Sequence, residues 1–174
     1  MLDVDTFLTV LYVAVDEFCT TRLPPERRPG PGAALGRSAA VALATFGRWG
    51  TFPTARACYR YAARHLRAAF PGLPARSQLN RLARRHRDAT TAFALYLSEQ
   101  PAAGRGAYEP LDTVGVPTRN AKLLYTFRLL RERPHCLAGF QARLAAHVAL
   151  HNFCLWLNAE LGRPRLAFAD LIDW

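Results

Sequence analysis

Apolar side chains recur at helical spacing along most of this 174-residue chain. Between Val4 and Cys19 they fall on one face of a helix, and Asp3 or Asp5 precedes that face as a candidate N-cap. The stretch 21–36 is rich in proline and glycine, which cannot continue a helix. The pattern therefore predicts an amphipathic first helix followed by a linker.

Two helices joined by a tight turn are expected next. Ser38 precedes a short apolar helix that stops near Gly50, and Thr54 precedes a helix that continues to Phe70. Only the four residues 50–53 separate the two helices. This arrangement is predicted to be a helix-turn-helix, with an ordinary helical hairpin as the alternative.

The rest of the pattern is helical with one exception. A single helix capped by Ser77 is expected to run to about Glu99. Residues 108–117 resemble a strand because of their β-branched side chains. Further helices are expected over 123–131 and 137–161, the second of which ends at Gly162 and Pro164. Its expected core face consists of Phe140, Leu144, Val148, His151 and Leu155.

The last nine residues, LAFADLIDW, mix apolar and acidic side chains. We expect them to form a C-terminal helix that docks on the other helices, with Trp174 filling a groove. A metal site that uses Asp170 and Asp173 is the alternative. The pattern as a whole predicts a mainly α fold.

Charge adds a candidate function to this picture. The net charge is +10, and the stretch from Arg27 to Arg87 holds thirteen arginines but no Asp or Glu. Because a solvated helix face normally mixes both signs, this distribution predicts a polyanionic partner, double-stranded DNA. The candidate DNA-binding residues are Arg48, Arg56, Arg60, Arg64, Arg67, Arg76, Arg81, Arg84, Arg85 and Arg87.

Gene composition and a membrane partner are rival interpretations of this charge. A GC-rich gene accounts for 22 arginines against the single Lys122, but not for the missing acids in the basic stretch. A membrane surface is the rival anion. No run approaches the ~18 apolar residues of a spanning helix, and the N-terminus is acidic, so neither an anchor nor a signal peptide is expected.

The chain has four widely spaced cysteines, Cys19, Cys58, Cys136 and Cys154. Each lies in a helical pattern, which favours free thiols in a cytosolic protein. A zinc site is the alternative, and its candidate ligands are His147, His151 and Cys154 with either His135 or Cys136.

Three segments together resemble a known family. FLTVLYVAVDEFC, YRYAARHLRAAFPGLPARSQLNR and LHNFCLWLNAELGRPRLAFADLIDW are similar to bacterial insertion-sequence transposases of the DDE class, family nine-eight-two. YEPLDTVGVPTRNAK resembles the first strand of that family's ribonuclease-H-like domain, and Asp112 matches its first metal-binding and catalytic aspartate. The resemblance implies Mg²⁺ as the family's cofactor and the terminal inverted repeats of the element as its DNA.

The sequence departs from the family pattern after this strand. RNAK is followed directly by LLYTF, where the family has a long stretch with its second aspartate and its glutamate. The resemblance therefore implies an internally deleted transposase. Residues 1–100 would be a helical DNA-binding region with a helix-turn-helix-like bundle. Residues 101–122 would be a linker and first-strand remnant, and residues 123–174 the helices left from a truncated ribonuclease-H-like domain.

The expected function is recognition of insertion-sequence ends without strand transfer. A two-metal site needs several convergent carboxylates, and Asp112 alone cannot hold the metals, so no cofactor is expected for the isolated chain. A partner chain that supplies the missing carboxylates, or a nuclease site built from Asp112, Asp170 and Asp173, would make the protein an enzyme. A helical oligomerisation protein is the third possibility. The expected location is the bacterial cytoplasm, at the nucleoid, and homo-oligomers or mixed oligomers with intact transposase are expected partners.

Overall fold

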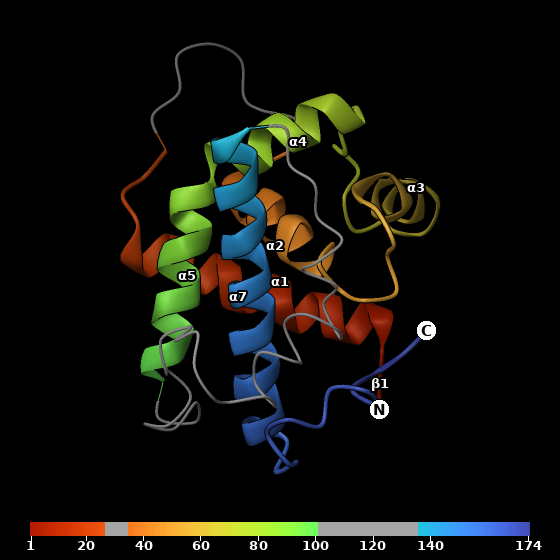
Figure 1. Ribbon diagram of the computed structural model, residues 1–174, viewed down its shortest axis with the longest axis vertical. Coiled ribbons are helices and arrows are strands. Elements are labelled where there is room, and N and C mark those ends of the chain that lie inside the picture. Colours follow the sequence, from red (N-terminus) through yellow and green to blue (C-terminus); the bar gives the residue numbers. More distant parts are fainter. Residues whose placement is uncertain (27–34, 101–135) are drawn as a thin grey trace.

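The described part of the chain is mainly helical, as the hydrophobic pattern predicts (Figure 1). A computed structural model describes residues 1–26, 35–100 and 136–174. Its helices are α1 (Val4–Arg22), α2 (Arg37–Phe46), α3 (Ala55–His65), α4 (Arg76–Arg85), α5 (Arg87–Glu99) and α7 (Leu137–Glu160). Two short strands are β1 (Leu2–Asp3) and β2 (Ile172–Asp173). The predicted strand at 108–117 and helix at 123–131 lie outside the described residues, as does Asp112.

The helix starts are partly those expected from the sequence. Asp3 caps α1, since its Oδ1 accepts a hydrogen bond from the Thr6 amide at 2.8 Å. Hydrogen bonds from the Thr6 hydroxyl and amide lower the pKa of this carboxyl. Ser38 and Ser77 are not caps, because α2 follows Gly36 and α4 follows Ala75, whose carbonyls already accept the first helical bonds. Helix α1 also runs to Arg22, beyond the predicted start of the linker.

Aromatic side chains join the helices into one core. The Phe7 ring of α1 lies 5.4 Å from Phe153 of α7 and 5.3 Å from Trp49, which follows α2. Phe18 at the other end of α1 lies 5.5 Å from Phe93 of α5. All five of these side chains are buried. Helix α7 runs beside α5 through this core, and α1 crosses behind them (Figure 1).

Helix α7 confirms the predicted long helix and part of its predicted face, since His151 and Leu155 are buried. From Ala149 to Leu155 every side chain is buried, so this part of the helix has no solvent face. Phe140, expected in the core, is 42% exposed, and smaller side chains at Ala142 and Ala146 are buried instead.

The end of α7 is the one predicted. Gly162 adopts a φ of 64°, a conformation that glycine reaches without steric cost. Its amide donates to the Ala159 carbonyl at 3.1 Å, and the Arg163 amide donates to the Asn158 carbonyl at 2.7 Å. These two bonds form a Schellman motif, which ends the helix and turns the chain back.

The helix predicted over 77–99 is in fact two helices that meet at His86. α4 lies across the top of the molecule, whereas α5 runs down its side (Figure 1). His86 has φ −94° and ψ 16°, and the hydroxyls of Thr90 and Thr91 donate to the carbonyls of His86 and Arg87, each at 3.0 Å. Such threonine bonds to the preceding turn bend helices. The His86 ring is only 6% exposed, and Nε2 lies 3.9 Å from Oε1 of Glu26.

The C-terminal segment docks as predicted but is not a helix. Residues 164–171 form turns, and β2 then pairs in parallel with β1, with Leu2 opposite Ile172. Trp174 is 46% exposed and packs against Phe46, Phe52 and Tyr61, with ring centroids 5.2–6.1 Å apart. The extended strand carries Trp174 to these rings. Within the described ranges, no helix combines the length and apolarity needed to cross a membrane.

Candidate nucleic-acid interface

A hydrogen-bonded connection over residues 47–54 joins α2 to α3. After Phe46 the amides of Arg48 and Trp49 donate to the carbonyls of Thr45 and Phe46, at 3.0 and 3.1 Å. Thr54 then caps α3, because its hydroxyl oxygen accepts a hydrogen bond from the Ala57 amide at 3.1 Å. The threonine cap is as predicted. The connection is longer than predicted, because α2 ends at Phe46 and not near Gly50, so residues 47–53 and not 50–53 alone precede the Thr54 cap.

Helix α3 is held by a few side chains at one face. Tyr61 lies 5.3 Å from Phe52 and 6.1 Å from Trp174, measured between ring centroids. The Tyr59 hydroxyl donates to the Pro74 carbonyl at 3.1 Å. Cys58 and Ala62 are buried. The helix is shorter than predicted, since it ends at His65 and the buried Leu66 and Phe70 follow in turns.

The opposite face of α3 is cationic. Arg56, Arg60 and Arg64 recur every four residues and are exposed, and Arg67 just beyond the helix is exposed as well. Among the residues that the structure describes, no ion pair involves any of these four. Within the described part of the chain, these four guanidinium groups thus face outward without a carboxylate partner.

Helix α4 adds a second exposed group of arginines. Arg76, Arg81, Arg84 and Arg85 are exposed, and no side chain of this helix is buried. The half-buried Leu79 and Leu82 attach α4 to the core. Neither α3 nor α4 has an acidic residue in its first turn, so the positive end of each helix dipole is not neutralised there.

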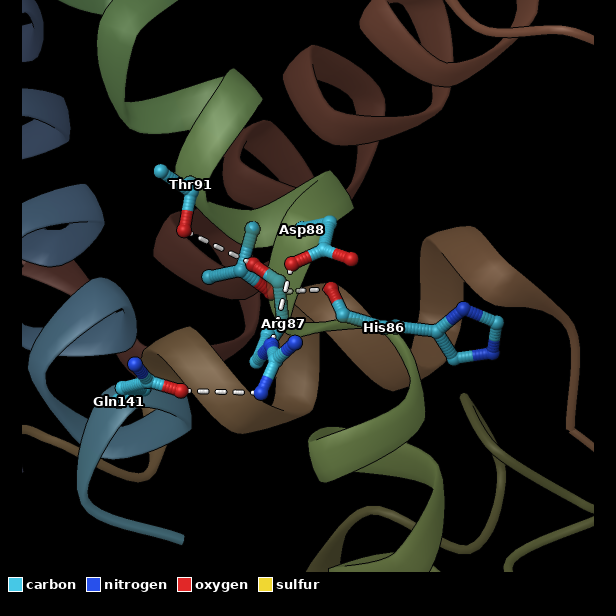
Figure 2. A network of polar contacts seen from close by, with 6 residues as sticks. His86, Arg87, Asp88, Thr91 and Gln141 are labelled. Atoms are coloured by element: carbon cyan, nitrogen blue, oxygen red, sulfur yellow. Dashed lines mark hydrogen bonds and ion pairs between the residues drawn. The ribbon is translucent and has the colours of Figure 1, made fainter. Parts of the chain in front are cut away.

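Arg48 and Arg87 differ from the other candidate DNA-binding residues. Both are half-buried. Arg87 donates from Nη1 to Gln141 of α7 at 2.9 Å, and its Nε lies 3.1 Å from Oδ1 of Asp88, as Figure 2 shows. The His86 ring points away from this network (Figure 2). Arg87 thus joins α5 to α7, and a phosphate would have to compete with these contacts.

Arg37 is the one arginine of the described basic stretch that was not a DNA-binding candidate. Its guanidinium donates to the carbonyls of Cys19 at 3.0 Å and Pro24 at 2.9 Å. These bonds satisfy backbone acceptors at and just beyond the C-terminal end of α1. Arg37 therefore stabilises the end of α1, a role that could not be predicted from the presence of an arginine alone.

Three of the candidate zinc ligands lie in the core, whereas the candidate Cys136 is exposed. His147, His151 and Cys154 are buried, and the His151 ring packs at 5.5 Å against Phe168. His147 Nδ1 lies 2.8 Å from the Arg143 carbonyl. Across residues 1–26, 35–100 and 136–174 there is no group of three side chains able to hold a metal ion. His135, one of the candidate ligands, lies outside these ranges.

A cavity of about 260 Å³ lies beside the arginine surface. Its walls come from the end of α2, from α3 and α4, and from the first turns of α7. The polar or ionisable residues that line it are Arg48, Cys58, Tyr59, Asn80, Arg84, Cys136 and Arg143. The sequence did not predict that Arg143 or Cys136 lies near the candidate DNA-binding arginines. Only the packing of α7 on α4 brings them to the arginines.

The four cysteines differ in their chemistry. Hydrogen bonds from the Gly139 amide and the Arg84 side chain lower the pKa of the exposed Cys136 thiol. Burial raises the pKa of Cys58 to about 11 and raises that of Cys154 well above its ordinary value. Since the thiolate is the nucleophile, only Cys136 combines exposure with a favourable ionisation.

Cys136 should therefore be the first thiol modified by iodoacetamide near neutral pH. The midpoint of its rate against pH should fall below the ordinary range of a thiol, because a lowered pKa leaves the thiolate present at lower pH. Peptide mass spectrometry at short reaction times would measure the modification of each cysteine. Equal rates at Cys136 and Cys58 in the folded chain would contradict this prediction.

Gly47 sets the distance between α2 and α3. A Cβ added at this position would lie 3.0 Å from Sγ of Cys58 and 3.1 Å from the Leu43 carbonyl oxygen. We expect Gly47→Ala to lower the free energy of unfolding by about 1–3 kcal/mol, because overpacking displaces neighbouring groups. Denaturant unfolding would measure the loss. Gly36→Ala is the matched control, since a Cβ there meets nothing within 4 Å and stability should change little.

Comparisons of this chain with protein-family models, with curated proteins and with solved structures find no match.

Proposed function

We propose that this chain binds double-stranded DNA through the arginines of α3 and α4. The observation that carries the proposal is the exposure of eight arginines, four on each of two neighbouring segments, with no ion pair to a carboxylate among the described residues. The segments are 56–67 and 76–85. Leaving so many like charges adjacent is unfavourable unless a polyanion neutralises them.

Helix α3 is the better candidate for the major groove. Only Cys58 and Ala62 of this helix are buried, and it projects at the edge of the molecule (Figure 1). A helix with side chains is about 10–12 Å wide, which matches the ~12 Å width of the groove. In this arrangement α2, the turn and α3 act as a helix-turn-helix, and α4 lies against the phosphate backbone.

Arginine suits both kinds of contact in this proposal. Its planar guanidinium can bind a phosphate, or the edge of a guanine, through two parallel hydrogen bonds. The exposed side chains at positions 56, 60 and 64 lie along one helical face and could reach successive sites in the groove. Arg81, Arg84 and Arg85 would make contacts that position the protein without reading sequence.

The family resemblance of the sequence supplies a DNA to test. It suggests the terminal inverted repeats of an insertion sequence as the target, bound without strand transfer, in the bacterial nucleoid. Asp112, the remnant of the family's catalytic and metal-binding set, lies outside the described residues. The chain would therefore bind these ends without cutting them, and it would form mixed oligomers with an intact transposase.

The test is the salt dependence of duplex binding. Fluorescence anisotropy of a labelled inverted-repeat duplex, and of an unrelated duplex of equal length, would be measured over a series of salt concentrations. If about five phosphates are neutralised, log K should fall against log salt with a slope near −4.5. A protein that forms oligomers but leaves the anisotropy of both duplexes unchanged would instead be a helical assembly protein.

A further inference from the structure

The cavity beside α4 carries a concentration of positive charge. Three guanidinium groups line it, from Arg48 after α2, Arg84 on α4 and Arg143 on α7. No carboxylate is among the described residues that line the cavity. Guanidinium groups bind phosphate with paired, charge-assisted hydrogen bonds, which are stronger than neutral ones. Three such groups from three separate elements form a cluster suited to an anion.

The first turn of α7 opens onto the same space. Cys136 and Gly139 line the cavity, and the 24-residue helix has no acidic residue in its first turn. Within this first turn, the backbone amide of Gly139 donates a hydrogen bond to Cys136 Sγ. The helix dipole adds a positive potential at this end, in the same direction as the arginines. The helix end therefore reinforces a site that the three side chains already define.

Small residues keep the space open. Five alanines form much of the wall, and Leu43 and Leu79 are the only long aliphatic side chains among the described residues that line it. The alanines are Ala44, Ala55, Ala83, Ala142 and Ala146. Its volume of about 260 Å³ lies just below the ~300–1,000 Å³ of pockets for drug-sized ligands. It far exceeds the ~30 Å³ that one water occupies in the liquid. The cavity is thus sized for a small anion, or for one group of a larger ligand.

We propose that this cavity binds a phosphate group, held by Arg48, Arg84 and Arg143 and by the first turn of α7. The group can belong to the backbone of a bound duplex or to a free phosphate compound. The first source rests on the proposed function, and the second does not. Asn80 and Tyr59 supply further polar atoms at the wall that can orient the oxygens.

Cys136 gives a direct readout of this site, because its thiol lines the cavity. The rate of Cys136 modification by iodoacetamide would be measured by peptide mass spectrometry with inorganic phosphate or pyrophosphate, and with sodium chloride at equal ionic strength. We expect saturating phosphate or pyrophosphate to slow the reaction at least tenfold relative to chloride. Equal rates in phosphate, pyrophosphate and chloride would overturn the proposal.

Variants distinguish phosphate binding in the cavity from a non-specific electrostatic effect of the anion on the thiol. Protection is the rate of Cys136 modification without phosphate divided by the rate with phosphate. Arg84→Gln and Arg143→Gln should each reduce this ratio at least threefold. Comparing this ratio within each variant removes any change in the basal reactivity of the thiol. Arg165→Gln, at an exposed position after α7, is the control and should keep the full protection. Circular dichroism would confirm that each variant is folded, and equal protection in all four proteins would overturn the proposal.

The same modification experiment with duplex DNA added identifies the source of the phosphate. If the duplex slows Cys136 modification in the original chain but not in Arg143→Gln, while anisotropy shows that both bind it, the group is a backbone phosphate. If inorganic phosphate protects Cys136 and the duplex does not bind, the proposed function fails and the cavity remains a site for a free phosphate compound. If the duplex binds and neither anion source protects Cys136, the cavity proposal fails and DNA binding stands.

Discussion

Replacing Arg56, Arg60, Arg64 and Arg67 together by alanine should weaken duplex binding at least about thirtyfold at about 0.15 M salt. Arg81, Arg84 and Arg85 account for three of the roughly five phosphate contacts, which leaves about two for these four arginines. Each contact contributes about 0.9 to the slope of log K against log salt, so two contribute about one and a half powers of ten at this concentration. The slope itself should flatten from about −4.5 to about −2.7. Fluorescence anisotropy over a salt series would give both quantities.

Two control variants isolate the cause of this loss. The same four positions changed to lysine keep the charge, so the slope should remain steep while any preference for a particular sequence weakens. Arg22→Ala with Arg165→Ala removes two charges away from the proposed surface and should lower affinity only slightly. Since the four arginines are exposed, the alanine variant should unfold within about 0.5 kcal/mol of the original chain. An unchanged slope in a folded alanine variant would contradict the proposed surface.

Removing residues 171–174 should abolish cooperative unfolding. Leu171 and Ile172 are buried, and truncating one such side chain typically costs about 2–5 kcal/mol. The deletion also removes the ring contacts of Trp174, worth about 0.5–1.5 kcal/mol each. The combined loss is comparable to the ~5–15 kcal/mol that stabilises a whole domain. Circular dichroism during heating would show a broad change in place of a sharp transition.

Single substitutions in the same segment provide the controls for this deletion. Asp173→Ala changes an exposed side chain and should leave the transition close to that of the original chain. Trp174→Phe keeps an aromatic ring beside Phe46 and Phe52 and should cost much less than the deletion. A truncated chain that unfolds at the original temperature would show that the C-terminal strand contributes little.

The sequence predicted the features that depend on local chemistry. Asp3 and Thr54 cap their helices because each accepts a hydrogen bond from an amide three residues later, within the same turn. Gly162 ends α7 because a positive φ suits glycine. The spacing of Arg56, Arg60 and Arg64 places them on one face of α3 without reference to the rest of the chain.

The features missed from the sequence depend on contacts between distant residues. The spacing of Leu79, Leu82, His86 and Phe93 continues one helical pattern, so nothing in the apolar pattern marks the bend at His86. Glu26 lies near the His86 ring only in the folded chain. Arg143 reaches the cavity only through the packing of α7 on α4. A local pattern carries no information on such juxtapositions.

The pairing of β1 with β2 has a consequence for the order of events in refolding. Leu2 and Ile172 come from opposite ends of the chain, so their pairing closes the largest loop among the described contacts. Neighbouring helices such as α1 and α2 form contacts that close much smaller loops. Because non-local contacts form slowly, the strand pair should be a late step. Trp174 follows that strand and packs on Tyr61, so this contact with α3 should also form only in this last step.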